Sequence, residues 1–505
     1  HPAAPAGERE RPGEGPATVF YLINTLDNFH LMDDFTQKTV QFKDWLISNG
    51  VKINPKIEIT DLRSQQQGRG VVALQNIAEN EELFSIPLKC VLASTDTNKN
   101  SNFNQLAEKY ELNDWSALIV RIMCSYKTSF WKPYFDLLPE KFNTPMFWDP
   151  EETEKLLKGS AVVSKIGREE ADELFEQLRT GIFSSPELEH VPKEDLTNAN
   201  FHRFGSLIMS YAFDLPAEVF VSESKSKSKD TDEEDEDDDG FEEDLEGSEE
   251  NIKAMVPLAD LLNSHSRLHN ARLCIPDDLD SNSPFNENAE LQMIATKDIA
   301  QGEQVYNTYG AHPSGDLLRR YGYVESSEPS EPSGTSETKF EILEISLEMI
   351  LNEAAAALKL PLTEIEKRVS NLEKYFDEVP PNFDITMQKE EEQTEAEIEF
   401  EPEMLILLYA LLHPSLDKKQ FKLVCKQADR SQLDPSICKI LEPVLESRRK
   451  EYGEIESNSE SNSHLQVFTT KEDMCTQVRR SEVEVITRTL EVINKSVHNK
   501  KPKLN

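Results

Sequence analysis

The chain is poor in cysteine and contains no long hydrophobic run. Its 505 residues include six cysteines, and no two of them stand in a C-x-x-C or C-x-C spacing. Zinc clusters need such spacings and disulfide frameworks belong to much smaller chains, so we expect neither and predict no metal site. A membrane-spanning helix needs about 18 consecutive apolar residues. The longest apolar segment, residues 404–412, predicts a buried helix instead, and we expect a reduced, intracellular protein with no membrane span.

Positive charge is also scarce. The chain has 54 Lys and Arg against 94 Asp and Glu, which gives a formal net charge of −40. Because a polyanion repels phosphate, this balance disfavours direct nucleic-acid binding, whereas it suits a basic protein partner. We expect the protein to act as a monomer.

The common enzyme signatures are missing as well. The sequence has no P-loop, no G-x-S-x-G, no H-E-x-x-H and no G-x-G-x-x-G after a predicted strand. The segment Gly68-Arg69-Gly70 lacks the third glycine, which excludes a Rossmann-type methyltransferase or dehydrogenase. By itself this segment fits a turn as well as a ligand-binding loop.

The first residues differ in composition from the rest of the chain. Residues 1–16 are rich in Ala, Pro, Gly, Glu and Arg, and they lack the apolar core of a secretion signal. We expect residues 1–31 to be a disordered or non-native extension and Met32 to start the native chain. Four residues at helical spacing predict an amphipathic helix over residues 33–49, namely Phe35, Thr39, Phe42 and Leu46.

Two similar segments indicate a divided β-domain. Residues 76–84 (N-I-A-E-N-E-E-L-F) resemble residues 298–306 (D-I-A-Q-G-E-Q-V-Y), and each predicts a strand, a turn and a second strand. Because they lie over 200 residues apart, we infer one β-domain, residues 32–102 and 251–325, interrupted by an insertion. The insertion, residues 103–229, is predicted to be mostly helical. Its clearest helices are predicted at residues 115–126 and 201–213.

Two polar segments divide the chain further. Residues 230–250 contain 15 acidic residues in 21 and predict a disordered acidic loop, with a docking strip for a basic partner as the alternative. Residues 326–338 are rich in Ser, Pro and Glu and predict a linker. The remainder, residues 339–505, is predicted to be an all-helical domain. Its helices are marked by Leu343, Leu347 and Ile350, by residues 404–412 and by residues 483–493. Its basic end, residues 500–503, is a weak candidate for a nuclear signal, with a frayed soluble tail as the alternative.

The most informative segment is residues 306–324, Y-N-T-Y-G-A-H-P-S-G-D-L-L-R-R-Y-G-Y-V. It contains two Tyr-Gly pairs, Tyr309-Gly310 and Tyr321-Gly322, with a predicted helix over residues 314–320 between them. Glycine lets the backbone approach closely beside each phenol, which suits a tight pocket or channel. Core aromatics are the alternative, so the meaning of this segment depends on the motifs around it.

Four motifs occur in order along the chain: Gly68-Arg-Gly-Val71, Asp260-Leu-Leu-Asn263, Asn307-Thr-Tyr-Gly310 and Tyr321-Gly-Tyr-Val324. Together they resemble the SET-domain protein lysine methyltransferases. More narrowly, they resemble the subfamily with a large helical insertion and a C-terminal substrate-binding domain of the Rubisco-large-subunit-methyltransferase type. The resemblance covers about residues 33–500. Residues 256–263, residues 269–273 and the run ending at Val324 look most like the fungal ribosomal-protein lysine methyltransferases.

The resemblance implies an α+β fold, in which a SET β-fold is split by the helical insertion and followed by an all-helical substrate-binding domain. It also implies S-adenosylmethionine as the cofactor and Tyr309 as the catalytic phenol. The residues implied to bind the cofactor are Gly68, Arg69, Gly70, Val71, Asn263, Ser264 and Tyr321. The residues implied to line the substrate channel are Tyr211, Tyr309 and Tyr321, with a core position on a helix face as the alternative for Tyr211.

The sequence departs from the family at one motif. The family places a histidine directly after the asparagine, whereas here Ser264 follows Asn263 and His265 is displaced by one position. This departure puts a histidine-mediated cofactor contact in doubt, and Ser264 would serve through its backbone instead. Asp260 is expected to be structural, because transfer to a neutral lysine needs no carboxylate as base.

The activity implied by the resemblance is S-adenosylmethionine-dependent protein-lysine N-methylation. We expect the target to be a lysine of a basic large-subunit ribosomal protein, and the site of action to be the nucleus and also the cytoplasm. The nucleophile must be neutral although the pKa of a free lysine is about 10.4, so a narrow aromatic channel must favour the uncharged amine. Two alternatives stay open: a catalytically silent SET-fold interaction protein, and a methyltransferase for another side chain such as histidine.

Overall fold

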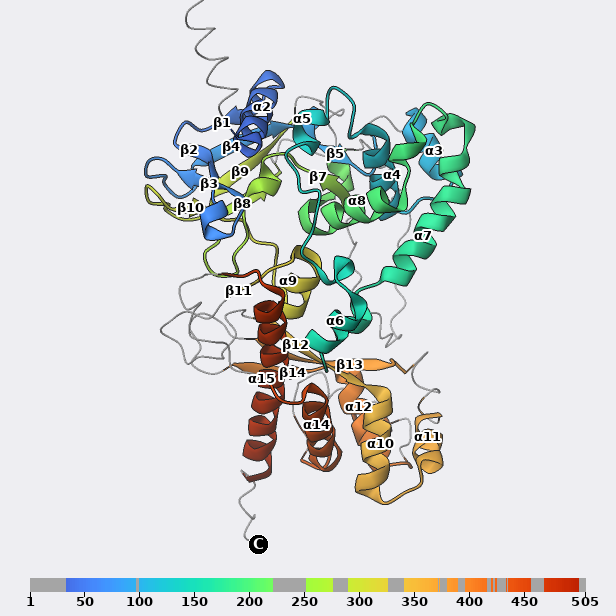
Figure 1. Cartoon of the computed structure of the whole chain (residues 1–505). Coiled ribbons are helices and arrows are strands. Elements are labelled where there is room, and N and C mark those ends of the chain that lie inside the picture. The colour runs from blue at the N-terminus through green and yellow to red at the C-terminus, as the bar shows by residue number, and fades with distance from the viewer. Residues whose placement is uncertain are drawn as a thin grey trace, which may run out of the picture.

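The computed structural model describes residues 33–96, 100–220, 251–275, 289–325, 340–370, 372, 379–388, 396–415, 419–420, 423–424, 433, 435–455 and 467–498. Four predictions lie outside these residues: the extension 1–31 with a start at Met32, the acidic loop 230–250, the linker 326–338 and the basic tail 500–503. The described residues form helices and several small, mainly antiparallel sheets (Figure 1), so the α+β fold class is confirmed.

The β-domain combines strands from both sides of the insertion. One antiparallel sheet has the order β1 (Lys52–Ile53), β4 (Glu82–Pro87), β9 (Glu290–Ala295) and β8 (Ala271–Cys274). A second has the order β10 (Gln304–Val305), β3 (Arg69–Ala73) and β2 (Ile57–Asp61). The two similar segments meet where Ile77 and Ile299 exchange both backbone hydrogen bonds, at 2.9 and 3.0 Å. The inference of one β-domain with an insertion is therefore confirmed.

Helix α2 (Asp34–Ser48) agrees with the helix predicted over residues 33–49. It begins after Asp33, whose side chain accepts a hydrogen bond from the Thr36 backbone N–H at 3.0 Å, as an N-cap does. Its apolar stripe, Phe42, Trp45 and Leu46, is buried in the same core as the strands of the β-domain.

The insertion is helical. Its helices are α3 (Asn102–Lys109), α4 (Asp114–Ser125), α5 (Lys132–Phe135), α6 (Pro150–Leu156), α7 (Arg168–Thr180) and α8 (Asn198–Tyr211). The helix predicted over residues 201–213 ends at Tyr211, because Ala212–Pro216 forms strand β6. Strand β6 pairs with β7 (Asn251–Met255), which in turn pairs with β5 (Leu92–Ala93). Pro216 cannot continue a helix, and its predecessor is biased toward extended backbone, which favours this early end.

The C-terminal domain is not all-helical, and that prediction is wrong. Its helices α10 (Leu347–Leu358), α11 (Leu362–Ser370), α12 (Pro402–Leu412), α14 (Cys438–Tyr452) and α15 (Lys471–His498) pack with an antiparallel sheet of β12 (Phe340–Ser346), β13 (Asn382–Gln388) and β14 (Glu397–Phe400). Leu343, predicted to be helical, lies in β12. Burial alternates along this strand, but one of its buried positions is occupied by Glu341. A charged residue at a core position hides the two-residue period that marks a strand. The helix predicted at residues 404–412 is confirmed, since α12 is buried over most of its length.

Helix α15 connects the C-terminal domain to the rest of the molecule. Just before it, β15 (Val467–Phe468) pairs with β11 (Val324–Glu325), the strand that follows the second Tyr-Gly pair. The same helix contributes to a small core that unites three parts of the chain. That core consists of Trp148, Leu157, Val162, Leu318, Val324, Met474, Cys475 and Val478. Figure 1 shows α15 running from β11 down the length of the C-terminal domain.

Among the residues that the structure describes, no helix is both long and apolar enough to cross a bilayer.

Candidate active site

A cavity of about 450 Å³ lies where the β-domain, the insertion and the C-terminal domain meet. Its wall combines the loop before β3, the loop after α5, the end of α8, residues 260–265, the tyrosines of the 306–324 segment, and Val467 and Thr469 in and just after β15. Seven of the predicted site residues line it: Gly68, Arg69, Tyr211, Asn263, Ser264, Tyr309 and Tyr321. The fold thus brings together residues from all four sequence motifs and from the helical insertion.

Two predicted cofactor residues do not line this cavity. Val71 is 1 % exposed and lies in the core, where β3 pairs with β2 and β10. Gly70 lies behind Asn263. A Cβ atom at Gly70 would come within 2.5 Å of Leu62 Cδ1, 2.7 Å of Gln304 Oε1 and 3.0 Å of Asn263 Nδ2. Glycine at this position therefore makes room for the side chains behind the cavity wall, and the predicted direct contacts of Gly70 and Val71 with a cofactor are not supported.

Arg69 lines the cavity, but its guanidinium group is occupied by protein contacts. It donates hydrogen bonds to Thr39 Oγ1 and the Phe35 carbonyl, both at 2.8 Å, and to the Leu137 carbonyl at 3.2 Å. The group also lies 3.6 Å from the centre of the Phe35 ring. Burial lowers the pKa of Arg69 from its usual value. Arg69 therefore clamps α2 and the loop after α5 around the cavity, and its backbone carbonyl is the part that faces Asn263.

The amide of Asn263 is held from behind. Its Nδ2 donates to Gln304 Oε1 at 2.6 Å and lies 3.3 and 3.4 Å from the carbonyl oxygens of Arg69 and Gln67. Beside it, Ser264 Oγ accepts a hydrogen bond from the Tyr309 backbone N–H at 3.1 Å. Ser264 therefore positions the main chain of Tyr309, a role that sequence reasoning did not assign to its side chain.

His265 is buried beneath this turn. Its Nδ1 accepts hydrogen bonds from the backbone N–H groups of Arg267 and Leu268, at 3.2 and 3.3 Å, and its ring stands edge-on to Tyr306. The imidazole thus stabilises the turn that follows Ser264. Because the histidine is displaced by one position, its role here is to stabilise this turn.

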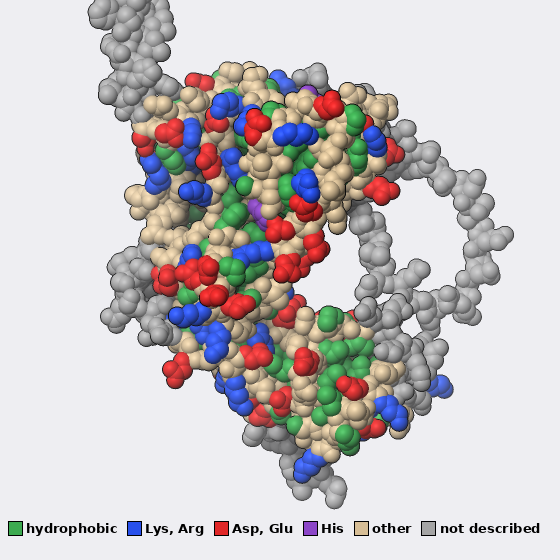
Figure 2. Space-filling model, turned by 45° about the vertical axis from the view of Figure 1, so that its right-hand side comes forward, with side chains coloured by type: hydrophobic (Ala, Val, Ile, Leu, Met, Phe, Trp, Pro, Cys, Tyr) green, Lys and Arg blue, Asp and Glu red, His purple; other side chains and the backbone are tan. Residues whose placement is uncertain are grey.

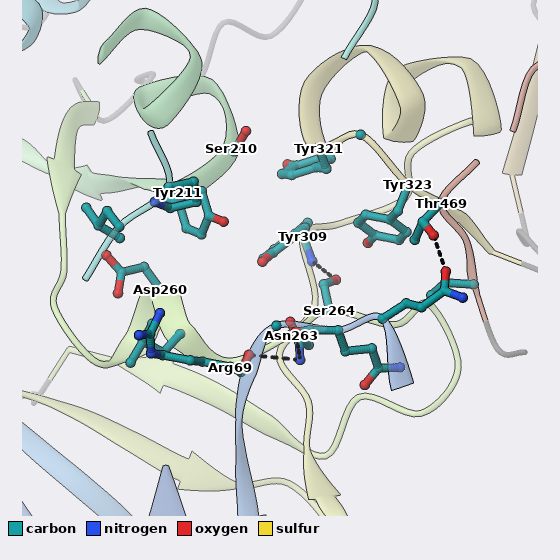
Figure 3. Close-up of a pocket in the computed structure, with 18 of the residues that line it drawn as sticks. Arg69, Ser210, Tyr211, Asp260, Asn263, Ser264, Tyr309, Tyr321, Tyr323 and Thr469 are labelled. Carbon is teal, nitrogen blue, oxygen red and sulfur yellow. Dashed lines mark hydrogen bonds between the residues drawn. The ribbon is translucent and has the colours of Figure 1, made fainter. Parts of the chain in front are cut away.

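The tyrosines form the aromatic part of the wall. The rings of Tyr309 and Tyr321 are stacked, and the Tyr321 and Tyr323 ring centres are 6.2 Å apart. The Tyr309 hydroxyl donates to the Leu262 carbonyl at 3.4 Å. Figure 3 shows the hydroxyls of Tyr309 and Tyr211 pointing into the same open space. The helix-face alternative for Tyr211 is compatible with this, because the residue ends α8 and still reaches the cavity.

Burial keeps these phenols protonated. It raises the pKa of Tyr309 well above its usual value, with smaller contributions from neighbouring tyrosines and Asp260. Burial likewise raises the pKa of Tyr211 to about 12, and those of Tyr321 and Tyr323 increase for the same reason. The hydroxyls therefore act at neutral pH as neutral hydrogen-bonding groups in a poorly solvated space.

Asp260 lies in the cavity wall and is 3 % exposed. Its Oδ2 accepts a hydrogen bond from the Tyr134 hydroxyl, and its Oδ1 has no hydrogen-bond partner among the residues that the structure describes. Burial raises the pKa of Asp260 to about 7. Sequence reasoning assigned Asp260 a structural role. Because Asp260 lies in the cavity wall, its negative charge, when the carboxyl group is ionised, also acts on any group bound in the cavity.

Sequence reasoning did not predict several other lining residues, among them Tyr323, Ser210, Val467 and Thr469. Tyr323 lies within the Y-G-Y run and lines both this cavity and an adjoining one of about 210 Å³, so its spacing from Tyr321 was an available signal. Ser210, beside Tyr211, donates to the Arg320 carbonyl at 2.6 Å. Val467 lies in β15 and Thr469 just after it, and Thr469 Oγ1 donates to Gln66 Oε1 across the cavity edge (Figure 3). No local pattern marks these two residues, because only the pairing of β15 with β11 brings them here.

Comparisons with known proteins agree with this architecture. The family model described as SET domain matches residues 68–310. The chain is similar to ribosomal lysine N-methyltransferase 4 of Saccharomyces cerevisiae, with 39% identity over 58% of this chain and 57% of that protein. It is also similar to N-lysine methyltransferase setd6 of Xenopus laevis, with 28% identity over 61% of each. The matched part therefore spans less than two thirds of these relatives.

Solved structures show the same fold. A crystal structure of the SET domain of LSMT bound to lysine and AdoHcy aligns with a TM-score of 0.61, at 16% identity over 92% of both chains. A structure of Rubisco LSMT bound to AdoMet aligns with a TM-score of 0.54, at 16% identity over 91% of this chain and 92% of that one. The predicted architecture, a SET fold with an insertion and a C-terminal domain, is confirmed by these alignments, the C-terminal sheet being the one correction.

Proposed function

We propose, from the match of residues 68–310 to the SET domain family model, that the protein is an S-adenosylmethionine-dependent protein-lysine N-methyltransferase. The observation that carries the proposal is the position of the Tyr309 hydroxyl. It lies in a half-buried aromatic wall of one cavity, and Asn263 and Ser264 line the same cavity. Such a space offers a polar end for a cofactor and an apolar passage for a lysine side chain.

The residues present fit such a cofactor. Asn263, the backbone beside Gly68 and the Ser264 turn would hold its amino-acid end, and the Tyr321 and Tyr323 rings would pack against its apolar parts. When bound, S-adenosylmethionine supplies an electrophilic methyl group on a sulfonium centre. In the transfer a nitrogen–carbon bond forms as the carbon–sulfur bond breaks, and the sulfur keeps the electron pair.

The aromatic wall would prepare the nucleophile. A lysine amine must lose its proton first, and lowering its pKa from about 10.4 by roughly 3 units corresponds to roughly 4 kcal/mol. Desolvation between Tyr211, Tyr309 and Tyr321 acts in this direction, because burial disfavours the ammonium form. The Tyr309 hydroxyl donates to the Leu262 carbonyl, so its lone pairs are left to accept a hydrogen from the amine and orient it.

We propose a basic ribosomal protein as the substrate. The name of the yeast relative supports this choice, as does the net charge of −40, which would speed encounter with a basic partner. On the face drawn in Figure 2, acidic side chains gather along the hollow that separates the upper part of the molecule from the C-terminal domain. Action in the nucleus and the cytoplasm stays a prediction.

The decisive experiment incubates the purified protein and labelled S-adenosylmethionine with an extract from cells that lack this protein. Transfer of label to a ribosomal protein, located on lysine by mass spectrometry, is the expected result. Label found on histidine would identify histidine, and not lysine, as the target residue. An absence of any transfer, despite bound cofactor, would favour a silent interaction protein.

A further inference from the structure

Gln304 stands directly behind Asn263 but does not line the cavity. It lies in β10, opposite Val72 of β3, and Gly70 of that strand leaves the space in which Gln304 and Asn263 meet. The backbone of Gln304 is itself held, because its carbonyl accepts a hydrogen bond from Asn270 Nδ2 at 3.0 Å. Gln304 is therefore a fixed support that acts on a ligand through the lining residues it contacts, among them Asn263.

Two backbone carbonyls determine the direction of this hydrogen-bond chain. Those of Arg69 and Gln67 lie near Asn263 Nδ2, and a carbonyl can only accept. The amide nitrogen must therefore point toward them, and Gln304 must present its oxygen, Oε1, to the same nitrogen at 2.6 Å. If either amide were turned over, two groups of the same kind would face each other.

The amide nitrogen of Gln304 continues this hydrogen-bond chain as a donor. Its Nε2 donates to Gln67 Oε1 at 2.7 Å and to the Tyr306 hydroxyl at 2.9 Å. The Tyr306 hydroxyl is in turn 3.5 Å from Gln67 Oε1. Every hydrogen bond of this chain thus pairs a donor with an acceptor. A connected network of this kind holds its side chains more firmly than a single hydrogen bond does.

We propose that Gln304 is a positioning residue that turns the Asn263 amide so that its carbonyl oxygen faces the cofactor's α-ammonium group. This inference rests on the proposed function. The described side-chain hydrogen bonds of Asn263 all use its Nδ2, so Oδ1 is the side-chain atom that faces a ligand. An acceptor in that place matches a ligand ammonium and mismatches a carboxylate.

The test compares two ligands that differ at the amino-acid end. S-adenosylhomocysteine carries the α-ammonium group, whereas 5′-methylthioadenosine lacks the whole amino-acid portion. The variant Gln304→Met keeps the length of the side chain and removes both polar atoms. We expect calorimetry to show about tenfold weaker binding of S-adenosylhomocysteine and unchanged binding of methylthioadenosine. The KM for S-adenosylmethionine should rise by a similar factor while kcat stays within about twofold.

A double-mutant cycle checks that Gln304 acts through its neighbour. Asn263→Ala should weaken S-adenosylhomocysteine binding, and adding Gln304→Met to it should cause no further loss. The matched control is Gln292→Met on β9, where Gln292 Nε2 donates to Glu82 Oε2 at 3.0 Å far from the cavity wall. It should leave both affinities unchanged.

Several outcomes would overturn the inference: equal weakening of both ligands, no weakening of either, or additive losses in the double variant. Should Gln304→Met not fold, Gln304→Glu keeps an acceptor beside Asn263 and is expected to lose less than about threefold in S-adenosylhomocysteine affinity; a larger loss would contradict the proposal. A wild-type protein that binds neither ligand would overturn the proposed function, and this inference with it.

Discussion

The rings of Tyr309 and Tyr321 are stacked, with centres 4.5 Å apart and an angle of 19° between their planes. Helix α9 (Ser314–Tyr321) returns the chain between them and ends at Gly322, which adopts the left-handed conformation. A Cβ atom at Gly322 would lie 2.7 Å from the Asn143 carbonyl, so glycine also permits the close approach of the insertion. The second Tyr-Gly pair thus places one phenol against the other and leaves the Tyr309 hydroxyl facing the cavity.

Removing the Tyr309 hydroxyl tests its role in transfer. Tyr309→Phe keeps the stacked ring but loses the group that would orient the amine, so kcat should fall on the order of 100-fold. The melting temperature should change little, because the ring remains buried. Labelled methyl transfer under saturating substrates is the measurement. Tyr409→Phe, in α12 of the C-terminal domain, is the matched control and should retain full activity. Wild-type turnover by Tyr309→Phe would refute the assignment.

Gly70→Ala tests the space behind Asn263. The added methyl group would press on Gln304 and Asn263 at 2.7 and 3.0 Å, so we expect a loss of about 1–3 kcal/mol in stability together with weaker cofactor binding. Gly205→Ala in α8 is the control, because its nearest neighbours would be at 3.7 Å and helix propensity favours alanine by about 1 kcal/mol. Thermal melts and calorimetry compare the pair. Equal behaviour of the two variants would argue against a crowded site at Gly70.

The contact between Thr469 and Gln66 predicts that the C-terminal domain supports cofactor binding. Thr469→Val keeps the shape of the side chain but removes the donor, and a neutral hydrogen bond is worth about 0.5–1.5 kcal/mol. The Kd for S-adenosylmethionine should therefore rise about two- to tenfold while the KM for the protein substrate is unchanged. Thr487→Val serves as the control, because the Thr487 hydroxyl contacts only Val483 of α15 and Arg449 of α14 among the described residues, away from the cavity. An effect on substrate KM alone would show that this contact serves docking and not the cofactor site.

Glu482 predicts a pH-dependent stability at the junction of the domains. It is 6 % exposed and accepts hydrogen bonds from Tyr452 and Ser160, at 2.5 and 2.7 Å. Burial raises its pKa from 4.5 to about 7. The folded state therefore holds this proton more tightly, so its contribution is fully present below pH 4.5 and is lost as the pH rises through about 7.

The corresponding measurement compares wild type with Glu482→Gln, which mimics the protonated acid. From pH 5 to pH 8 the wild type should lose up to about 3 kcal/mol that the variant keeps. Asp260 acts in the same direction in both proteins, so the difference between them isolates Glu482. Parallel stability profiles for wild type and variant would contradict the prediction.

From the raised pKa of Asp260 we predict that its substitution changes the pH dependence of methyl transfer. Its pKa of about 7 means that it becomes anionic near neutral pH, and an anion beside the cavity favours the ammonium form of a bound lysine. Asp260→Asn should therefore shift the acidic limb of the kcat profile to lower pH, because the amine then loses its proton more easily. Loss of activity at every pH would instead show that the carboxylate itself accepts the proton.

Sequence reasoning succeeded where the evidence was local or ordered along the chain. The helical spacing of Phe42 and Leu46 predicted α2, and the repeated segments around Ile77 and Ile299 predicted a divided β-domain. It failed at β12, because buried Glu341 replaces an apolar residue. The Glu341 carboxylate accepts a hydrogen bond of 2.5 Å from the hydroxyl of Ser314 in α9. The residues around Glu341 in the sequence do not predict this partner.

The sequence by itself determined the family resemblance, the order of the motifs and the candidate tyrosines, because each depends on residue types at short spacings. Only the tertiary structure decided what each residue touches. In the structure the Arg69 guanidinium group binds α2 and the loop after α5, and Gly70 lies behind Asn263. Gln304 supports the Asn263 amide, and Thr469 lies at the cavity edge. These contacts join residues tens to hundreds of positions apart. They form only when the shared cores offset the entropy of closing such long loops, and no local pattern encodes that balance.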